Sequence, residues 1–274
     1  MKIGMLMRGE MIKAWNRFAI VAFTVTVALT ALIVVLPDFI MHRRNAENPA
    51  VTFPGVWAVL IRQPAAICLM IVAVVTVLIV ASEFMWRTAR QNVIDGLSKD
   101  QWFVAKYLTS LFFGVLFLLI ILTVGAAIAA LSPFASFIRA VDLRMIGYYA
   151  IALIGIITIA FFLAIVIRRD GGALGVFLLW QGLGEPLVAL AFEKMHKGWG
   201  RILYYMPLHT ISANMDQRYW DPNGARAMMG GMRRPPGITD GTFFPSFSTN
   251  LSLTVGYILL FLFLGYWNFK SRDL

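Results

Sequence analysis

Cysteine and charge are scarce in this 274-residue sequence. Cys68 is the single cysteine, so the chain can form neither an intramolecular disulfide nor a cluster of thiolate metal ligands. Charged residues make up 14% of the sequence against 59% hydrophobic residues, which excludes a water-soluble surface and indicates that the bilayer is the main solvent. The net charge of +10 is scattered among apolar runs, which disfavours nucleic acid as a partner and favours anionic lipid headgroups.

Motifs for several enzyme classes are also missing. The segment closest to a phosphate-binding loop, Gly4–Met11, has two glycines at the right spacing but lacks the Lys and the Ser or Thr that contact phosphate and magnesium. His42, His196 and His209 form neither a metalloprotease helix motif nor a recognisable triad, and no nucleophile elbow is present. We therefore expect no catalytic residues, no metal site and no cofactor bound by this chain.

Six apolar segments are long enough to cross a membrane as helices. A bilayer core of about 30 Å takes about 20 apolar residues in a helix, which satisfies its own backbone hydrogen bonds where water is absent. The predicted spans are Phe18–Leu36, Ala65–Ala81, Phe103–Leu131, Met145–Ile167, Gly172–Phe192 and Leu251–Phe269. The first is longer than the apolar region of a signal peptide and lacks a clear cleavage site, so we interpret it as a retained helix. The prediction is an all-α integral membrane protein with one transmembrane domain over residues 1–274.

The distribution of Lys and Arg predicts the orientation. With the N-terminus inside, twelve basic residues fall on each side of the membrane, but seven of the outer twelve lie in residues 193–250. Long loops are translocated with little regard to charge, and the short segments alone carry twelve basic residues inside against five outside. We therefore expect both termini in the cytoplasm.

The segments outside the spans differ in character. Apolar residues recur near helical spacing over residues 1–17, with basic residues between them, which predicts an interfacial amphipathic helix or, alternatively, a charged tail that orients the first span. Residues 193–250 are rich in Gly and Pro turns, which predicts an extracytoplasmic loop or small lid without a core of its own. The methionines of this loop, with His196 and His209, are soft enough for Cu(I), but no repeated ligand spacing supports a site and apolar packing is the alternative.

The most informative stretch is residues 82–99, between the second and third spans. Its helical pattern continues beyond the predicted membrane segment, with two distinct faces. The apolar face, which would lie on the protein, comprises Trp86, Ala89, Val93 and Leu97. The residues that project elsewhere, toward a partner, are Arg87, Arg90, Gln91 and Asp95.

Local signals within this stretch agree with a short helix. Glu83 and Arg87 stand at i and i+4 in the order that favours an ion pair. Gly96 is a helix stop where a left-handed residue is required, and Ser98 with Gln101 forms a capping box for the third span. The pattern predicts a short cytoplasmic helix joined to a membrane helix by a tight turn, although a solvated connection without a function is the alternative.

The segment Glu83–Ser98, which reads EFMWRTARQNVIDGLS and is followed by Lys106 and Tyr107, resembles the permease family of ABC-type exporters (ABC-2 type) that includes bacitracin-resistance and sodium-export systems. The resemblance is specific over residues 81–108 and is supported elsewhere only by the helix count and the basic start. It implies an amphipathic connecting helix over 1–17, six transmembrane helices, and a coupling helix over 82–99 that docks on a separate ATP-binding subunit. The residues assigned to coupling are Glu83, Trp86, Arg87, Arg90, Gln91, Asn92, Asp95, Gly96, Leu97 and Ser98.

The same resemblance implies a transport function in the cell membrane. Two permeases, identical or related, would pair above two nucleotide-binding subunits, and ATP and Mg²⁺ would be bound by those partner subunits. The expected function is coupling of the partner's ATP hydrolysis to export of a substrate that the sequence does not specify. Two alternatives are a membrane sensor or anchor of a regulatory complex and an ATP-independent carrier.

Polar residues in and near the fifth span form a second candidate site. Glu185, with Gln181 one turn before it, is an ionisable residue in an apolar segment, which indicates either a gate or cargo contact or a structural role at a helix break near Pro186. The preceding turn, Arg168–Asp170, is expected to set topology, with contact to the ATPase as the alternative. Gly171 and Gly175 form a small-xxx-small pair, a weak signal for dimerisation.

Overall fold

The computed structural model describes residues 64–131, 140–196, 199–215 and 247–272, and this part of the chain is helical, without strands. The predicted first span, the amphipathic segment 1–17 and the turns within 221–237 lie outside the described residues. The described part contains eight α-helices, one π-helix and one 3₁₀ helix. The α-helices are α4 (Pro64–Met85), α5 (Thr88–Ile94), α6 (Lys99–Leu131), α7 (Ala140–Ile167), α8 (Asp170–Leu179), α9 (Glu185–Met195), α10 (Pro207–Ala213) and α13 (Phe247–Ser271).

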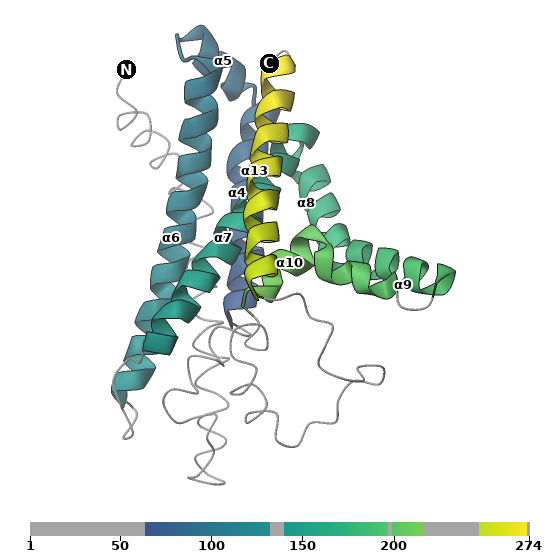
Figure 1. Ribbon diagram of the computed structural model, residues 1–274. Helices are drawn as coiled ribbons and strands as arrows, with labels where there is room; N and C mark the ends of the chain where they lie inside the picture. The colour runs from purple at the N-terminus through teal and green to yellow at the C-terminus, as the bar shows by residue number, and fades with distance from the viewer. Residues whose placement is uncertain (1–63, 132–139, 197–198, 216–246, 273–274) are drawn as a thin grey trace, which may run out of the picture.

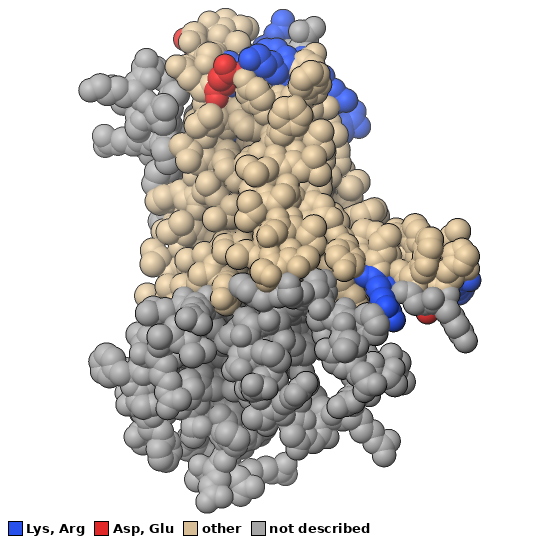
Figure 2. All heavy atoms as spheres, in the orientation of Figure 1, with Lys and Arg blue, Asp and Glu red and all other residues tan. Residues whose placement is uncertain are grey.

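Five stretches of helix are long and apolar enough to cross a membrane, which is typical of a multi-pass membrane protein. They are Ile67–Met85, Lys99–Ile120, Ile146–Ile167, Asp170–Met195 and Ser248–Ser271. The second to sixth predicted spans are thus confirmed as helical, and the helices that contain them extend a few residues beyond the predicted bounds at one or both ends. On the face seen in Figure 2, the middle of the bundle is free of charged side chains, and Lys and Arg gather at the end that carries α5 and on the arm formed by α9.

The long helices α4, α6, α7 and α13 form a bundle in which α7 contacts each of the others (Figure 1). Helices α4 and α7 are in extensive contact, and each carries a buried residue at every fourth position, most of them alanines, which allow close helix packing. These residues are Ala73, Val77 and Ala81 on α4 and Ala152, Ile156, Ala160 and Ala164 on α7. At the α5 end, aromatic rings join four helices: Trp102 of α6 stacks on Phe269 of α13 with centroids 4.9 Å apart, Phe84 of α4 contacts both, and Phe103 of α6 contacts Phe161 of α7.

The predicted fifth span is not one regular helix. The π-helix η2 (Trp180–Gly184) separates α8 from α9, and α9 leaves the bundle sideways (Figure 1). The irregularity therefore lies before Pro186, which occupies the first turn of α9, where a missing backbone N–H is tolerated.

The prediction that residues 193–250 form a loop without a core of its own is also only partly correct. The 3₁₀ helix η3 (Trp199–Tyr205) runs back beside α9, and α10 then packs on α7 and α13. Leu208 and Ile211 of α10 are buried, and a Cβ added at Gly155 of α7 would lie 2.9 Å from Ile211 Cγ2. Residues 207–213 are thus part of the core, because an apolar helical face was hidden among the turn signals of the surrounding segment.

Candidate functional site

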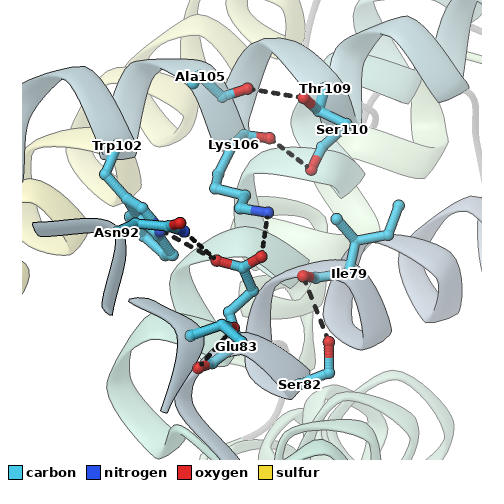
Figure 3. Close-up of polar contacts among 10 residues, drawn as sticks. Ile79, Ser82, Glu83, Asn92, Trp102, Ala105, Lys106, Thr109 and Ser110 are labelled. Atoms are coloured by element: carbon cyan, nitrogen blue, oxygen red, sulfur yellow. Dashed lines mark hydrogen bonds and ion pairs between the residues drawn. The ribbon is translucent and has the colours of Figure 1, made fainter. Parts of the chain in front are cut away.

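Glu83, in the last turn of α4, forms a buried ion pair with Lys106 of α6 (Figure 3). Lys106 Nζ lies 2.7 Å from Glu83 Oε1, and the two residues are 2% and 7% exposed. A charged pair this deeply buried is stable only when its remaining polar atoms also have partners. The pair therefore fixes the end of α4 against the first turns of α6.

The second oxygen of the Glu83 carboxylate accepts two further hydrogen bonds (Figure 3). Trp102 Nε1 of α6 donates at 3.1 Å, and Asn92 Nδ2 of α5 donates at 3.3 Å. Thr88, the first residue of α5, donates through its hydroxyl to the Glu83 backbone carbonyl at 3.3 Å. A single carboxylate thus holds α4, α5 and α6 together.

The short helix α5 begins and ends at residues with left-handed backbone conformations. Arg87 precedes it with a φ of 56°, and Gly96 follows it with a φ of 100°. Ser98 and Gln101 then cap α6 reciprocally: Gln101 N donates to Ser98 Oγ at 3.1 Å and Ser98 N donates to Gln101 Oε1 at 3.2 Å. The glycine stop and the capping box predicted from the sequence are both confirmed.

Two features of this segment differ from the sequence prediction. Glu83 pairs with Lys106, not with Arg87, because α4 ends at Met85 and the left-handed turn at Arg87 removes the i, i+4 geometry. Trp86 lies in that turn and is 76% exposed, so its assignment to the inward face was wrong. Ala89 is buried and Leu97 packs against the core, as predicted for that face.

The outward face of α5 combines large apolar and charged side chains. Trp86, Ile94 and Met85 are exposed, with Ile94 at 67%. The predicted outward residues Arg87, Arg90, Gln91 and Asp95 are also exposed, and Gln91 Nε2 donates to Asp95 Oδ1 at 3.0 Å. We call this set, with Trp86, Ile94 and Met85, the α5 face. Exposed Trp and Ile beside Arg are the composition of a protein-binding surface.

The second candidate residue, Glu185, is buried at the first position of α9. Its Oε1 accepts from the Leu208 backbone N–H and its Oε2 from the His209 backbone N–H, each at 2.7 Å. These donors belong to the first turn of α10, whose N–H groups lack intrahelical partners. Trp180 Nε1 donates to the same carboxylate at 3.3 Å. Gln181 is not among the donors to this carboxylate in the described residues, and its buried Oε1 has no hydrogen-bond partner there. The geometry supports the structural role for Glu185: it docks α10.

The opposite end of α10 is held by buried amides and hydroxyls. Asn214 Nδ2 donates to Thr254 Oγ1 of α13 at 2.8 Å, and Asn250 Nδ2 donates to Asn214 Oδ1 at 2.9 Å. Asn250 Nδ2 also donates to the Thr210 backbone carbonyl at 3.1 Å. Sequence reasoning missed this cluster, since Asn214 lay in the predicted loop and Asn250 at its boundary.

Sequence reasoning also missed the roles of Lys106 and Trp102. A lysine seven residues after the start of a 33-residue apolar helix requires an acidic partner. Asp95 and Asp100 lie in or beside the connection between the two spans, and the next acidic residue toward the N-terminus is Glu83, at the end of the preceding span. That signal could have identified the pair. In the described part of the chain, no three or more His, Cys, Asp or Glu side chains gather in a way that could hold a metal ion.

Comparison with known proteins places the chain in a family without assigning it a function. The chain is 28% identical over 219 residues to the uncharacterized protein YhcI of Bacillus subtilis (strain 168), a match that covers 72% of this chain and 61% of YhcI. The chain thus spans less than two thirds of the length of that relative. A family model described as protein of unknown function (DUF2705) matches residues 31–203. These residues include α4 to α9 and therefore Glu83 and its partners Asn92, Trp102 and Lys106. Since this match covers more than half of the chain, the protein belongs to the DUF2705 family of proteins of unknown function.

Proposed function

We propose that the protein is the membrane subunit of an ABC-type exporter and that the α5 face docks on a separate ATP-binding subunit. The observation that carries the proposal is an exposed apolar and basic face on a short helix that is anchored from behind by a buried ion pair. Trp86, at 76%, and Ile94, at 67%, lie beside arginines, and Trp with Arg is a combination enriched where proteins bind one another.

The anchoring supports a role in transmitting motion. A flexible loop that bound a partner would move without its membrane helices. Here Asn92 and Thr88 tie α5 to Glu83 on α4, and Lys106 and Trp102 tie Glu83 to α6. Trp102 in turn stacks on Phe269 of α13. A displacement of α5 is therefore transferred to three long helices through side-chain contacts.

In the proposed mechanism, ATP binding closes the partner dimer and pushes the α5 face, and α4 and α6 tilt as rigid bodies. A second permease, identical or related, completes the cargo path. We place the protein in the cell membrane with both termini in the cytoplasm. The α5 end, the Arg168–Arg169 turn and the C-terminal end of α13 then lie on the cytoplasmic side, and α9, η3 and α10 lie on the outer side. The basic residues at the α5 end (Figure 2) belong to the short segments whose excess of Lys and Arg supports this orientation.

Affinity purification of the detergent-solubilised protein from its native host tests the proposal. We expect an ATP-binding subunit to co-purify in stoichiometric amount. Charge reversal at Arg87 or Asp95 should reduce that recovery, whereas Arg201→Glu, a charge reversal of an exposed residue in η3, should not. Recovery of the chain alone in mild detergents, with other membrane complexes from the same cells intact, would contradict the proposal.

Their relation to ATP hydrolysis distinguishes two alternative functions from that of an exporter subunit. An ATP-independent carrier would be purified without an ATP-binding subunit. A membrane sensor or anchor would retain a partner whose ATPase activity is not altered by the permease. An exporter subunit should instead change the partner's ATPase activity, and charge reversal in the α5 face should abolish that change.

A further inference from the structure

The part of the fifth predicted span that runs along the bundle is too short to cross the bilayer. It consists of the ten residues of α8, which begin at Asp170 in the charged turn after α7, and the five residues of η2. At about 1.5 Å per residue these reach about 22 Å along the helix axis, whereas the hydrocarbon core is about 30 Å thick. Helix α9 then leaves the bundle sideways, before the level at which α6 ends (Figure 1). The arm formed by α9 and η3 therefore starts inside the leaflet that lies away from α5.

An apolar stripe continues from the bundle onto this arm. Large apolar side chains are exposed at intervals of three or four residues from α8 through η2 to α9. They are Val176, Leu179, Leu183, Leu187 and Leu190, each between 44% and 63% exposed. Glu185 is the one charged residue in residues 176–190, and its buried carboxylate accepts from the N–H groups of α10. Because the stripe continues the outward side of α8, which lies at membrane depth, the same acyl chains can contact both helices.

The exposed charged and aromatic groups of the arm lie where headgroups and water are expected. Figure 2 shows charged side chains along the lower edge of the arm and at its tip, whereas the side toward the α5 end carries none on this face. The exposed charged residues of α9 and η3 are Glu193, Lys194 and Arg201. Trp199 stacks on Phe192 with ring centroids 6.2 Å apart and stays 54% exposed. Tryptophan and lysine beside an apolar stripe are typical of a helix that lies in the membrane interface.

We propose that α9 lies in the plane of the membrane, with Leu187 and Leu190 among the acyl chains of the leaflet away from α5 and Lys194 and Trp199 at its headgroups. This is the outer leaflet in the orientation proposed above. The depth at which α9 begins and the continuity of its stripe with α8 favour lipid over a protein partner. Since Glu185 joins the base of the arm to α10, the leaflet would also help to hold α10 against α7 and α13. The inference depends on membrane insertion and not on the exporter function, so either can fail without the other.

Electron paramagnetic resonance of single spin labels tests the position of the arm, with the full chain in vesicles of phosphatidylethanolamine and phosphatidylglycerol. Labels at Leu187→Cys or Leu190→Cys report collisions with oxygen, which is enriched in lipid, and with a water-soluble nickel chelate. The references are Leu259→Cys, exposed on the α13 span, and Ile94→Cys, an equally apolar and exposed position on α5. We expect the ratio of oxygen to nickel accessibility at Leu187 and Leu190 to exceed that at Ile94 severalfold and to approach that at Leu259. Cys68 is 1% exposed, so the unsubstituted protein should take up no label.

The two labelled positions on α9 guard against loss of the fold, because either one alone decides the question. All the replaced side chains are exposed, so each variant should keep the helical content and the gel-filtration profile of the unsubstituted protein. Nickel accessibility at Leu187 and Leu190 equal to that at Ile94 would place the stripe in water and overturn the proposal. Low accessibility to both oxygen and nickel would show that protein covers the stripe, either a second copy or another segment of this chain, and would also overturn it.

Discussion

Replacement of Lys106 by methionine tests whether the buried ion pair anchors the α5 segment. Methionine retains the unbranched apolar stem of lysine and removes the ammonium group. The carboxylate of Glu83 would then stay buried with its hydrogen bonds from Asn92 and Trp102 but without a counter-charge. We expect a large loss of stability, because an uncompensated buried charge costs more than the pair itself contributes.

The magnitude follows from the geometry. At a separation of 2.7 Å and an effective dielectric constant of about 20, the attraction between the two charges is about 6 kcal/mol. Desolvation of the two ions offsets much of this attraction, at several kcal/mol for each ion. Removal of one partner from such a pair lowers the free energy of unfolding by about 3–5 kcal/mol. The two hydrogen bonds that Glu83 keeps place Lys106→Met near the lower limit of that range.

A double-mutant cycle with Glu83→Gln separates the ion pair from other effects of the substitutions. Glu83→Gln leaves Lys106 without its counter-charge and should also cost about 3 kcal/mol, whereas the double variant, with no buried charge, should cost about 1–2 kcal/mol. Unfolding in mixed micelles with increasing SDS, followed by circular dichroism, gives the four free energies. Arg90→Met, which also replaces one positive charge by a thioether but on the exposed α5 face, should change stability by less than about 0.5 kcal/mol. Equal losses for Lys106→Met and Arg90→Met, or additive single effects, would refute the reasoning.

Three further predictions concern both ends of the bundle. Trp86→Ala with Ile94→Asp should leave the thermal unfolding temperature unchanged and abolish co-purification of the ATP-binding subunit; a folded variant that keeps its partner would exclude the α5 face. Glu185→Ala leaves one buried and one part-buried N–H group of α10 without their acceptor and should cost about 2–4 kcal/mol of unfolding free energy, measured by SDS titration; a change below 1 kcal/mol would contradict the docking role. Gly155→Val inserts a side chain where Ile211 lies and should cost about 1–3 kcal/mol, and additional Ile211→Ala should restore part of it; no rescue would contradict the contact.

The spans were predictable because hydropathy over about 20 residues is a strong signal, and no competing structure satisfies the backbone in lipid. The second to sixth predicted spans appear as helical segments, and the first predicted span lies outside the described residues. Pro186 indicated a helix break in this region, but its form and position, a π-helix at Trp180–Gly184, were not predictable, since a π-helix has no residue signature and does not change the hydropathy. The short α10 was missed for a related reason: seven residues are too few for a periodic pattern to stand out.

The local chemistry of the candidate site was predictable only where the partners are close in sequence. Gly96 and the Ser98–Gln101 capping box are short-range features, and both were correct. Glu83 finds Lys106 across a distance of 23 residues, and the sequence offered a nearer partner in Arg87. What decided between them was the end of α4 at Met85, which no residue pattern marked.

Two buried glutamates hold the two short helices at opposite ends of the bundle (Figure 1). Glu83 contacts α5 through a side-chain amide at 3.3 Å but contacts Lys106 of α6 at 2.7 Å, so its stronger bond lies between the long helices. Under a load on α5, the Asn92 contact would yield before the ion pair, because a 3.3 Å hydrogen bond from an uncharged amide is weaker than a 2.7 Å bond between two opposite charges. Below that load, α4, α5 and the start of α6 move as one body. If the exporter proposal is correct, loss of the Asn92–Glu83 hydrogen bond alone should therefore uncouple the partner's ATPase activity from transport without loss of the complex.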